Sequence, residues 1–233
     1  LARVPEFAAR MQWFLDYRPD LARLVSRFGE KGMADRRLLS LLRRHRLKSV
    51  LAKLLDETEF LSPHGVRALS RYHAEHPYVL EHGGMRYTVE YQPGESRSGL
   101  FGGNSNWRGP VWMPVNYLII ESLQKYHHFY GDDFRVECPT GSGNWMNLWE
   151  VASELSRRLV SLYTAREPSG ARPVDKALGA FAADPAFTEH PMFYEYFHGD
   201  DGTGLGASHQ TGWTALLAKL VQQSVYWKRG PRG

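Results

Sequence analysis

The stretch that decides the fold is MPVNYLIIESLQKYHHFYG, residues 113–131. Its apolar side chains recur at intervals of three and four residues, which is the spacing of one face of an α-helix. Pro114 suits the first turn of a helix, where its missing N–H costs no hydrogen bond. We therefore predict a long helix here, with one apolar face formed by Val115, Leu118, Ile119, Leu123 and Tyr126.

The same helical spacing extends through most of the chain on either side of this stretch. Ser62 and Pro63, for example, form a good pair of cap and first helical residue. The further helices that we predict span residues 5–17, 19–28, 34–57, 62–72, 144–165, 174–183 and 211–227. Helices that alternate with elaborate loops favour a mainly α-helical fold, and a helical toroid over a coiled bundle.

Two internal segments and the C-terminal tail depart from the helical pattern. MRYTVEYQ, residues 85–92, alternates apolar and polar side chains, which predicts a half-buried strand of a small hairpin. Residues 93–110 hold five glycines and two prolines, which indicates a long irregular loop, and such loops are usually functional. We expect the tail KRGPRG, 228–233, to be disordered, and we assign residues 1–227 to part of one domain.

The overall composition is that of a globular protein with an ample core. Of the 233 residues, 42% are hydrophobic, 23% are charged and 13% are aromatic, and the aromatic residues cluster between positions 87 and 213. The single cysteine, Cys138, excludes an internal disulfide and a cysteine-based zinc site, and we interpret it as a buried structural thiol. Since no run of 18 apolar residues occurs, we expect no membrane partner.

The net charge is +4, and most of the basic excess sits in one segment, MADRRLLSLLRRHRLKSVLAKLL, residues 33–55, which has seven basic residues and one acidic residue. Leucines recur along it at helical spacing, so the basic side chains would share the opposite face of a helix. A solvated outer face of a packed helix is the preferred interpretation. A surface that binds nucleic acid is the alternative, and we do not expect a nucleic-acid partner.

The candidate catalytic residue is Glu195, which lies between Tyr194 and Tyr196 in PMFYEYFHGDDGTGLGASHQTGW, residues 191–213. A carboxylate that aromatic rings partly shield from water is suited to act as a base near neutral pH. The glycines that follow allow a backbone to approach closely, and Trp213 offers a face for stacking. An exposed glutamate whose aromatic neighbours pack elsewhere is the alternative interpretation.

A second candidate segment is NSNWRGPVWMPVNY, residues 104–117. Trp107 and Trp112 would lie near the start of the long helix, with Arg108 and Pro110 between them. Indole rings stack on the apolar C–H faces of sugars, while arginine and asparagine donate hydrogen bonds to hydroxyl groups. A rigid tryptophan- and proline-rich plug of the core explains the pattern equally well.

Other signals for cofactors are weak, and we expect neither a cofactor nor a metal. GTGLG, residues 202–206, lacks the lysine and the serine or threonine of a phosphate-binding loop. His73, His76 and His82 around Glu75 match no common spacing of metal ligands. The acidic pairs Asp132 with Asp133 and Asp200 with Asp201 fit helix caps better than calcium ligands.

Taken together, these motifs resemble the catalytic domain of glycoside hydrolase family 63. The resemblance rests on NWRGPVWMPVNYLI, on YEYF before a glycine-rich loop, and on GWTALLAKL. It covers roughly residues 55–222, and EFLSPHGVRALSRYH with YGDDFRVECPTGSG is similar to a bacterial branch of that group. The family includes processing α-glucosidases and mannosylglycerate hydrolases.

The resemblance implies an (α/α)6 toroid and inverting hydrolysis of an α-glucoside or α-mannoside. Glu195 would be the general base, which deprotonates the water that attacks the anomeric carbon. The substrate would be an oligosaccharide or a small glycoside. The residues implied in its pocket are Trp107, Arg108, Trp112, Asn116, Tyr194, Tyr196 and Trp213.

An inverting enzyme also needs a general acid, and the resemblance places it in a Trp-Asp motif that this sequence lacks. About half of the helices of a toroid are predicted here. We therefore expect the chain to be the C-terminal half of the catalytic domain, partnered by an N-terminal half and inactive alone. The similarity to bacterial enzymes leads us to expect a cytoplasmic enzyme.

Two other functions remain compatible with the sequence. A non-catalytic carbohydrate-binding or scaffold domain would keep the aromatic pocket and lack turnover. A related toroid with other chemistry, such as trehalose hydrolysis, would use the same kind of site. Substitution of Glu195 separates catalysis from binding.

Overall fold

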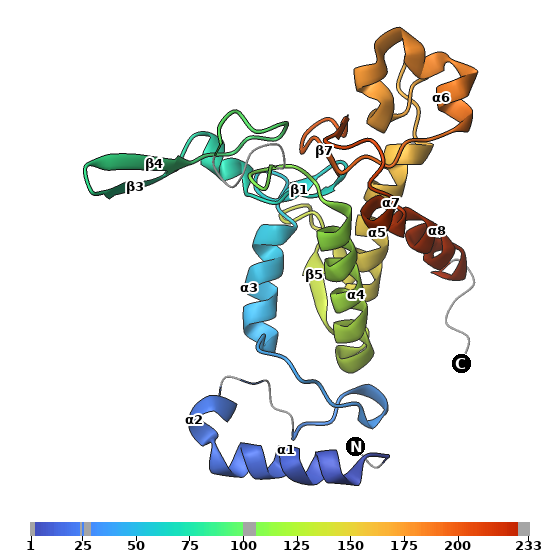
Figure 1. Ribbon diagram of the computed structural model, residues 1–233. Coiled ribbons are helices and arrows are strands. Elements are labelled where there is room, and N and C mark those ends of the chain that lie inside the picture. The colour runs from blue at the N-terminus through green and yellow to red at the C-terminus, as the bar shows by residue number, and fades with distance from the viewer. Residues whose placement is uncertain (1–2, 24, 26–28, 100–105, 228–233) are drawn as a thin grey trace.

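The computed structural model describes residues 3–23, 25, 29–99 and 106–227 (Figure 1). The α-helices are α1 (Pro5–Tyr17), α2 (Pro19–Ala22), α3 (Arg44–Leu54), α4 (Met113–Tyr130), α5 (Leu148–Thr164), α6 (Pro185–Glu189), α7 (Thr211–Thr214) and α8 (Leu216–Trp227). The 3-10 segments are η1 (Met33–Asp35), η2 (Arg71–Ala74) and η3 (Pro173–Ala183). The prediction of a mainly α-helical chain is confirmed.

The strands form four separate antiparallel pairs, each of two strands. These pairs are β1 (Leu61–Ser62) with β2 (Gly65–Val66), β3 (Tyr78–His82) with β4 (Met85–Val89), β5 (Arg135–Glu137) with β6 (Trp145–Asn147), and β7 (Tyr196–Phe197) with β8 (Gly204–Leu205). No larger sheet occurs in the described part of the chain, so the strands serve to fold loops back on themselves.

The core lies where α4 and α5 run side by side, with α8 packed against both (Figure 1). Helix α5 begins with a capping box, in which the Asn147 side chain accepts from the Glu150 backbone and the Glu150 carboxylate accepts from the Asn147 backbone. Its inward face is fully buried and includes Leu148, Ala152, Leu155 and Leu159. The spacing over 144–165 predicts these four residues on one face together with Trp145 and Trp149, but Trp145 lies in β6 and is 57% exposed.

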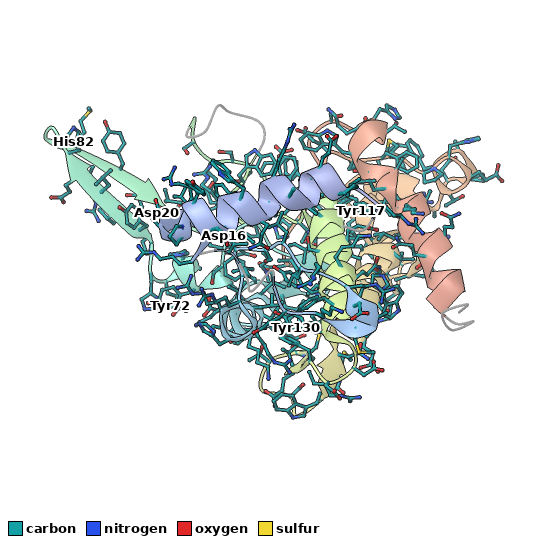
Figure 2. The ribbon with its side chains drawn as sticks, turned by 90° about the horizontal axis from the view of Figure 1, so that it is seen from below. Asp16, Asp20, Tyr72, His82, Tyr117 and Tyr130 are labelled. Atoms are coloured by element: carbon teal, nitrogen blue, oxygen red, sulfur yellow. The ribbon has the colours of Figure 1, made fainter. Side chains whose placement is uncertain are left out.

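Two parts of the molecule project from this core. The β3–β4 hairpin extends away from the helices, and Figure 2 shows His82 at its tip. Helix α1 lies across the underside of the molecule (Figure 2). None of the described residues before Leu47 is buried, which leaves large apolar side chains of α1 exposed.

Several predicted elements are present. The predicted helix over 5–17 is α1, and the helix over 113–131 is α4. The predicted strand over 85–92 is β4 and pairs with β3 in a hairpin, although its first residues are exposed rather than half-buried.

The predicted apolar face of α4 is wrong in part. Val115 and Leu118 are 41% and 66% exposed, whereas Asn116 and Gln124 are buried. The reason is that Asn116 is drawn inward by hydrogen bonds to β2, which the spacing of apolar residues does not reveal.

The predicted helix over 34–57 is wrong in its first half, because α3 begins only at Arg44. Ala34 and Asp35 have positive φ angles of 53° and 57°, and Arg36 is extended, so no helix can continue through them. Contacts with the end of α4 hold this segment, including a hydrogen bond between the hydroxyl groups of Ser40 and Tyr126.

The predicted helix over 62–72 is also wrong, since this stretch forms the β1–β2 turn and η2. The Ser62 hydroxyl accepts from the His64 amide at 3.1 Å, which closes a tight turn instead of capping a helix. The Val66 amide then donates to the Asn116 side chain at 2.7 Å, so tertiary contacts replace the helical hydrogen bonds.

The other predicted helices are present with altered bounds. The helix over 144–165 starts after Asn147, because residues 145–147 pair as β6. The segment 174–183 is the 3-10 element η3, which is kinked at Gly179, and 211–227 is divided at Ala215 into α7 and α8. Of 19–28, only α2 is helical among the described residues, and the predicted disordered tail 228–233 lies outside the described part.

Candidate active site

Backbone pairing joins the two segments that sequence analysis singled out. The Val111 amide donates to the Phe197 carbonyl at 2.8 Å, and the Phe197 amide donates to the Val111 carbonyl at 2.9 Å. Both side chains are fully buried, so water does not compete for these bonds. Residues 106–112 are therefore held beside strand β7, which directly follows Glu195.

Four aromatic rings form a cluster that includes Tyr196, the residue after Glu195. Trp107 stacks on Trp112 with ring centroids 3.9 Å apart and an angle of 2°, and Trp112 stacks on Tyr196 at 4.7 Å. Trp213 lies across them, 5.4 Å from Trp112 and 6.4 Å from Trp107. Trp107 and Trp213 remain 43% and 36% exposed, whereas Trp112 and Tyr196 are buried. The cluster thus presents two indoles to solvent on a rigid base.

Burial also affects the Tyr196 hydroxyl. Burial, together with the nearby carboxylates of Glu95 and Glu195, raises the pKa of Tyr196 to about 12. This phenol is therefore protonated at neutral pH.

Arg108 is buried, and its guanidinium contacts neutral oxygens. It donates to the side chains of Asn106, Ser96 and Ser98, which come from the loop before Trp107. The Asn106 carbonyl in turn accepts from the Trp112 indole at 3.0 Å. Arg108 thus ties the start of the loop to its end and supports the tryptophan stack.

Asn116 and Tyr194 have structural contacts as well. The Asn116 side-chain oxygen accepts from the Val66 amide, and its Nδ2 donates to the Val66 and Trp112 carbonyls. Tyr194 is buried, and its carbonyl accepts from the Thr214 hydroxyl at 2.5 Å. The predicted pocket residues therefore divide into two exposed indoles and five buried side chains, which are Arg108, Trp112, Asn116, Tyr194 and Tyr196.

Glu195 is held by the loop that follows it. Its amide donates to the Ala207 carbonyl at 2.8 Å, and the Ala207 amide donates to Glu195 Oε2 at 3.2 Å. The neighbouring β7–β8 pair, in which Tyr196 faces Leu205, continues the same antiparallel alignment. A partly exposed carboxylate, fixed beside aromatic faces, can accept a proton from water.

A polar cluster near this site is not predicted by the sequence motifs. Arg67, which is 4% exposed, donates to Asp200 Oδ1 through Nε at 3.2 Å and Nη2 at 2.9 Å. The Tyr91 hydroxyl donates to the same oxygen at 2.9 Å. Burial is the main cause that raises the pKa of Tyr91 far above its usual range. The available signal was one arginine inside the otherwise apolar GVRAL, residues 65–69.

Close backbone approach connects this cluster to the tryptophan loop. The Gly199 amide donates to the Pro93 carbonyl at 2.8 Å, and a Cβ at Gly199 would lie 2.4 Å from the Gly109 carbonyl oxygen. No side chain fits there. The glycine-rich loop is therefore packed tightly against its neighbours at this point.

The weaker candidates have structural roles. Burial raises the pKa of the Cys138 thiol to about 11, so the nucleophilic thiolate is disfavoured at neutral pH. His76 stacks on Tyr72 at 4.1 Å, and the described residues contain no group of three or more metal-ligating side chains. Within the part of the chain that the structure describes, no helix is long and apolar enough to cross a bilayer.

Comparisons with known proteins match most of the chain. Residues 37–214 match the model of the mannosylglycerate hydrolase MGH1-like glycoside hydrolase domain. The uncharacterized protein YMR196W of Saccharomyces cerevisiae is 50% identical over 218 residues, which are 92% of this chain and 20% of that protein. The chain therefore spans about a fifth of the length of this relative.

Two more distant relatives carry a named activity. The mannosyl-oligosaccharide glucosidase of Saccharomyces cerevisiae is 25% identical over 76% of this chain and 15% of its own length. Alpha-glucosidase 2 of Arabidopsis thaliana is 28% identical over 50% of this chain and 11% of its own length. These relatives are eukaryotic, so the expected bacterial affiliation is not supported.

Proposed function

The chain belongs to the family of mannosylglycerate hydrolase MGH1-like glycoside hydrolase domains, and we propose that it carries the general base of an inverting α-glycosidase. Glu195 is the proposed base. In an inverting reaction, it takes a proton from the water that attacks the anomeric carbon, while a carboxylic acid on the opposite side protonates the leaving oxygen.

The observation that carries this proposal is the pairing of Val111 with Phe197. It brings a carboxylate held by backbone contacts beside a cluster of tryptophans, although the two are far apart in sequence. Trp107 and Trp213 offer exposed indole faces for a sugar ring, and Arg108, Trp112, Asn116, Tyr194 and Tyr196 support them from the buried side.

The general acid is proposed to come from the remainder of a longer protein. The two relatives with glucosidase names reported above are several times longer than this chain, and their matches to it cover 15% and 11% of their lengths. We propose that α4, α5 and α8 belong to an (α/α)6 toroid that a preceding segment completes. The exposed apolar side chains of Val115 and Leu118 on α4 are suited to pack against that segment.

The proposed substrate class is an oligosaccharide or small glycoside with a terminal α-glucose or α-mannose. The names of the distant relatives favour glucose attached to an oligosaccharide. A panel of α-glucosides and α-mannosides decides between the two sugars.

The test uses the full-length protein with wild-type Glu195 and with Glu195→Gln. We expect the wild type to release sugar and the variant to lose at least about 100-fold in kcat, the scale of lost acid–base catalysis. Glu189→Gln, at the exposed end of α6, is the matched control and should keep wild-type activity. NMR of the first product should show the inverted anomer.

Three outcomes count against the proposal. Equal rates for wild type and Glu195→Gln remove Glu195 as the base. A retained anomeric configuration removes the inverting mechanism. Binding of sugars without turnover by the wild-type protein favours a carbohydrate-binding scaffold instead.

A further inference from the structure

The loop after Glu195 contacts the carboxylate at one position that only glycine can occupy. Gly206 has a φ of +68°, a region that residues with a Cβ seldom adopt. A Cβ built there would lie 2.7 Å from Glu195 Oε2 and 2.7 Å from Tyr196 Cε1. Because Gly206 has no Cβ, the Glu195 carboxylate oxygen can lie in the space beside it.

The neighbouring contacts show which group would move if a Cβ were added. Tyr196 is fully buried and stacks on Trp112 at 4.7 Å, so its ring has little room. The Glu195 backbone is fixed by the bond from its amide to the Ala207 carbonyl. The carboxylate is the flexible end of its side chain, so it is the group that an added Cβ would displace first. The Tyr196 ring and the Glu195 Cβ, which would lie 2.7 Å and 3.0 Å from that Cβ, have less freedom to move.

We propose that Gly206 is a positioning residue, which sets the orientation of the Glu195 carboxylate for catalysis. This inference rests on the proposed function of Glu195. Gly206 leaves no space for a side chain beside Glu195 Oε2, and the Ala207 amide donates a hydrogen bond to the same oxygen at 3.2 Å. Together these two contacts narrow the range of directions open to the carboxylate.

The consequence is a separation between binding and chemistry. Gly206 lies against the carboxylate and the buried ring of Tyr196, whereas the exposed indoles of Trp107 and Trp213 are the proposed sugar surfaces. Displacing a catalytic group by about 1 Å can cost about 100-fold in rate. Gly206→Ala should therefore lower kcat strongly and change KM by less than about threefold, since ground-state binding is retained.

The decisive experiment is a double-mutant cycle in the full-length protein, with wild type, Gly206→Ala, Glu195→Gln and the double variant. If Gly206 acts through the Glu195 carboxylate, Gly206→Ala should cost about 100-fold in the wild-type background and little in the Glu195→Gln background. Residues that act as a unit are non-additive in this way. Equal losses in both backgrounds, or a loss that lies in KM, overturn the proposal.

Two further variants exclude a general effect of backbone strain. Gly141 also has a positive φ, of +80°, but a Cβ there would meet nothing within 4 Å, so Gly141→Ala tests the strain alone. Gly206→Asn keeps the added Cβ while tolerating a positive φ better than alanine. It should lower kcat as Gly206→Ala does, and full activity in this variant also overturns the proposal.

The cycle distinguishes failure of this inference from failure of the proposed function. If Glu195→Gln alone has wild-type activity, the assignment of the base is wrong. If Glu195→Gln is inactive and Gly206→Ala is fully active, the base stands and only the positioning role fails.

Discussion

The region around Glu195 and the region before Leu47 use their apolar side chains in opposite ways. Around Glu195, Trp112, Tyr196 and Phe197 are buried by contacts between segments that are distant in sequence. In α1, Phe7 and Trp13 are 53% and 57% exposed, although the helix forms where its pattern predicts. An amphipathic pattern therefore predicts a local element in both regions, but it does not identify what covers the element.

Among the substitutions that test this contrast, we expect the largest loss of stability for Arg67, which belongs to the polar cluster with Asp200 and Tyr91. Arg67→Ala removes both hydrogen bonds to Asp200 and the bond from Nη1 to the Leu61 carbonyl. We expect a loss of about 3 kcal/mol in the free energy of unfolding, at the low end for a broken buried pair because Asp200 is partly exposed. Urea denaturation of the full-length protein measures it.

Arg71→Ala, at an exposed position of η2, is the matched control and should change the free energy of unfolding by less than about 0.5 kcal/mol. A loss below about 1 kcal/mol for Arg67→Ala contradicts the view that a buried polar cluster supports the site.

A smaller effect is expected from His64, which packs against the glycine-rich loop at Gly202. Burial, then Lys176, lowers the pKa of His64 from its ordinary value of 6.5. The unfolded chain therefore binds a proton at this ring more readily than the folded chain does. The contribution of the neutral His64 ring to the free energy of unfolding is fully present above about pH 7. This contribution is lost as the pH decreases through the pKa of the unfolded state towards that of the folded state.

The measurement is the change in the free energy of unfolding between pH 7.5 and pH 5.5. His64→Phe should lose less stability over this interval than the wild type, because the buried titrating group is absent. His82→Phe, at the exposed tip of the hairpin, should follow the wild type (Figure 2). An unchanged pH dependence in His64→Phe shows that burial of this ring is not coupled to stability.

The smallest effect is expected in α1. Phe7→Ala removes an exposed ring, so the free energy of unfolding should change by less than about 0.5 kcal/mol. Thermal unfolding of the full-length protein checks this value. A loss above about 1 kcal/mol contradicts the contrast between the two regions and shows that other residues cover the Phe7 ring.

Much of the local structure could be predicted because it depends on neighbours within one or two helical turns. Pro5 and Pro114 lie in the first turns of α1 and α4, as their fixed φ requires. The alternation in residues 85–92 likewise predicts β4. These features follow from propensity and periodicity, which the sequence displays directly.

The errors occur where a distant side chain competes with the helix for backbone hydrogen bonds. Residues 62–72 have a good cap and a helical spacing, yet Asn116 on α4 binds the backbone of Val66 instead. The same competition turns Asn116 inward and leaves Leu118 exposed. A partner 50 residues away leaves no local signal.

The sequence by itself determined the mainly helical class, the aromatic character of the site and the candidacy of Glu195. Those features reside in residue types and short spacings. Only the tertiary structure decided that Val111 pairs with Phe197, that Trp107 and Trp213 stay exposed, and that Gly206 abuts the carboxylate. These depend on which segments meet, because burial and close approach are set by contacts across the fold rather than by order along the chain.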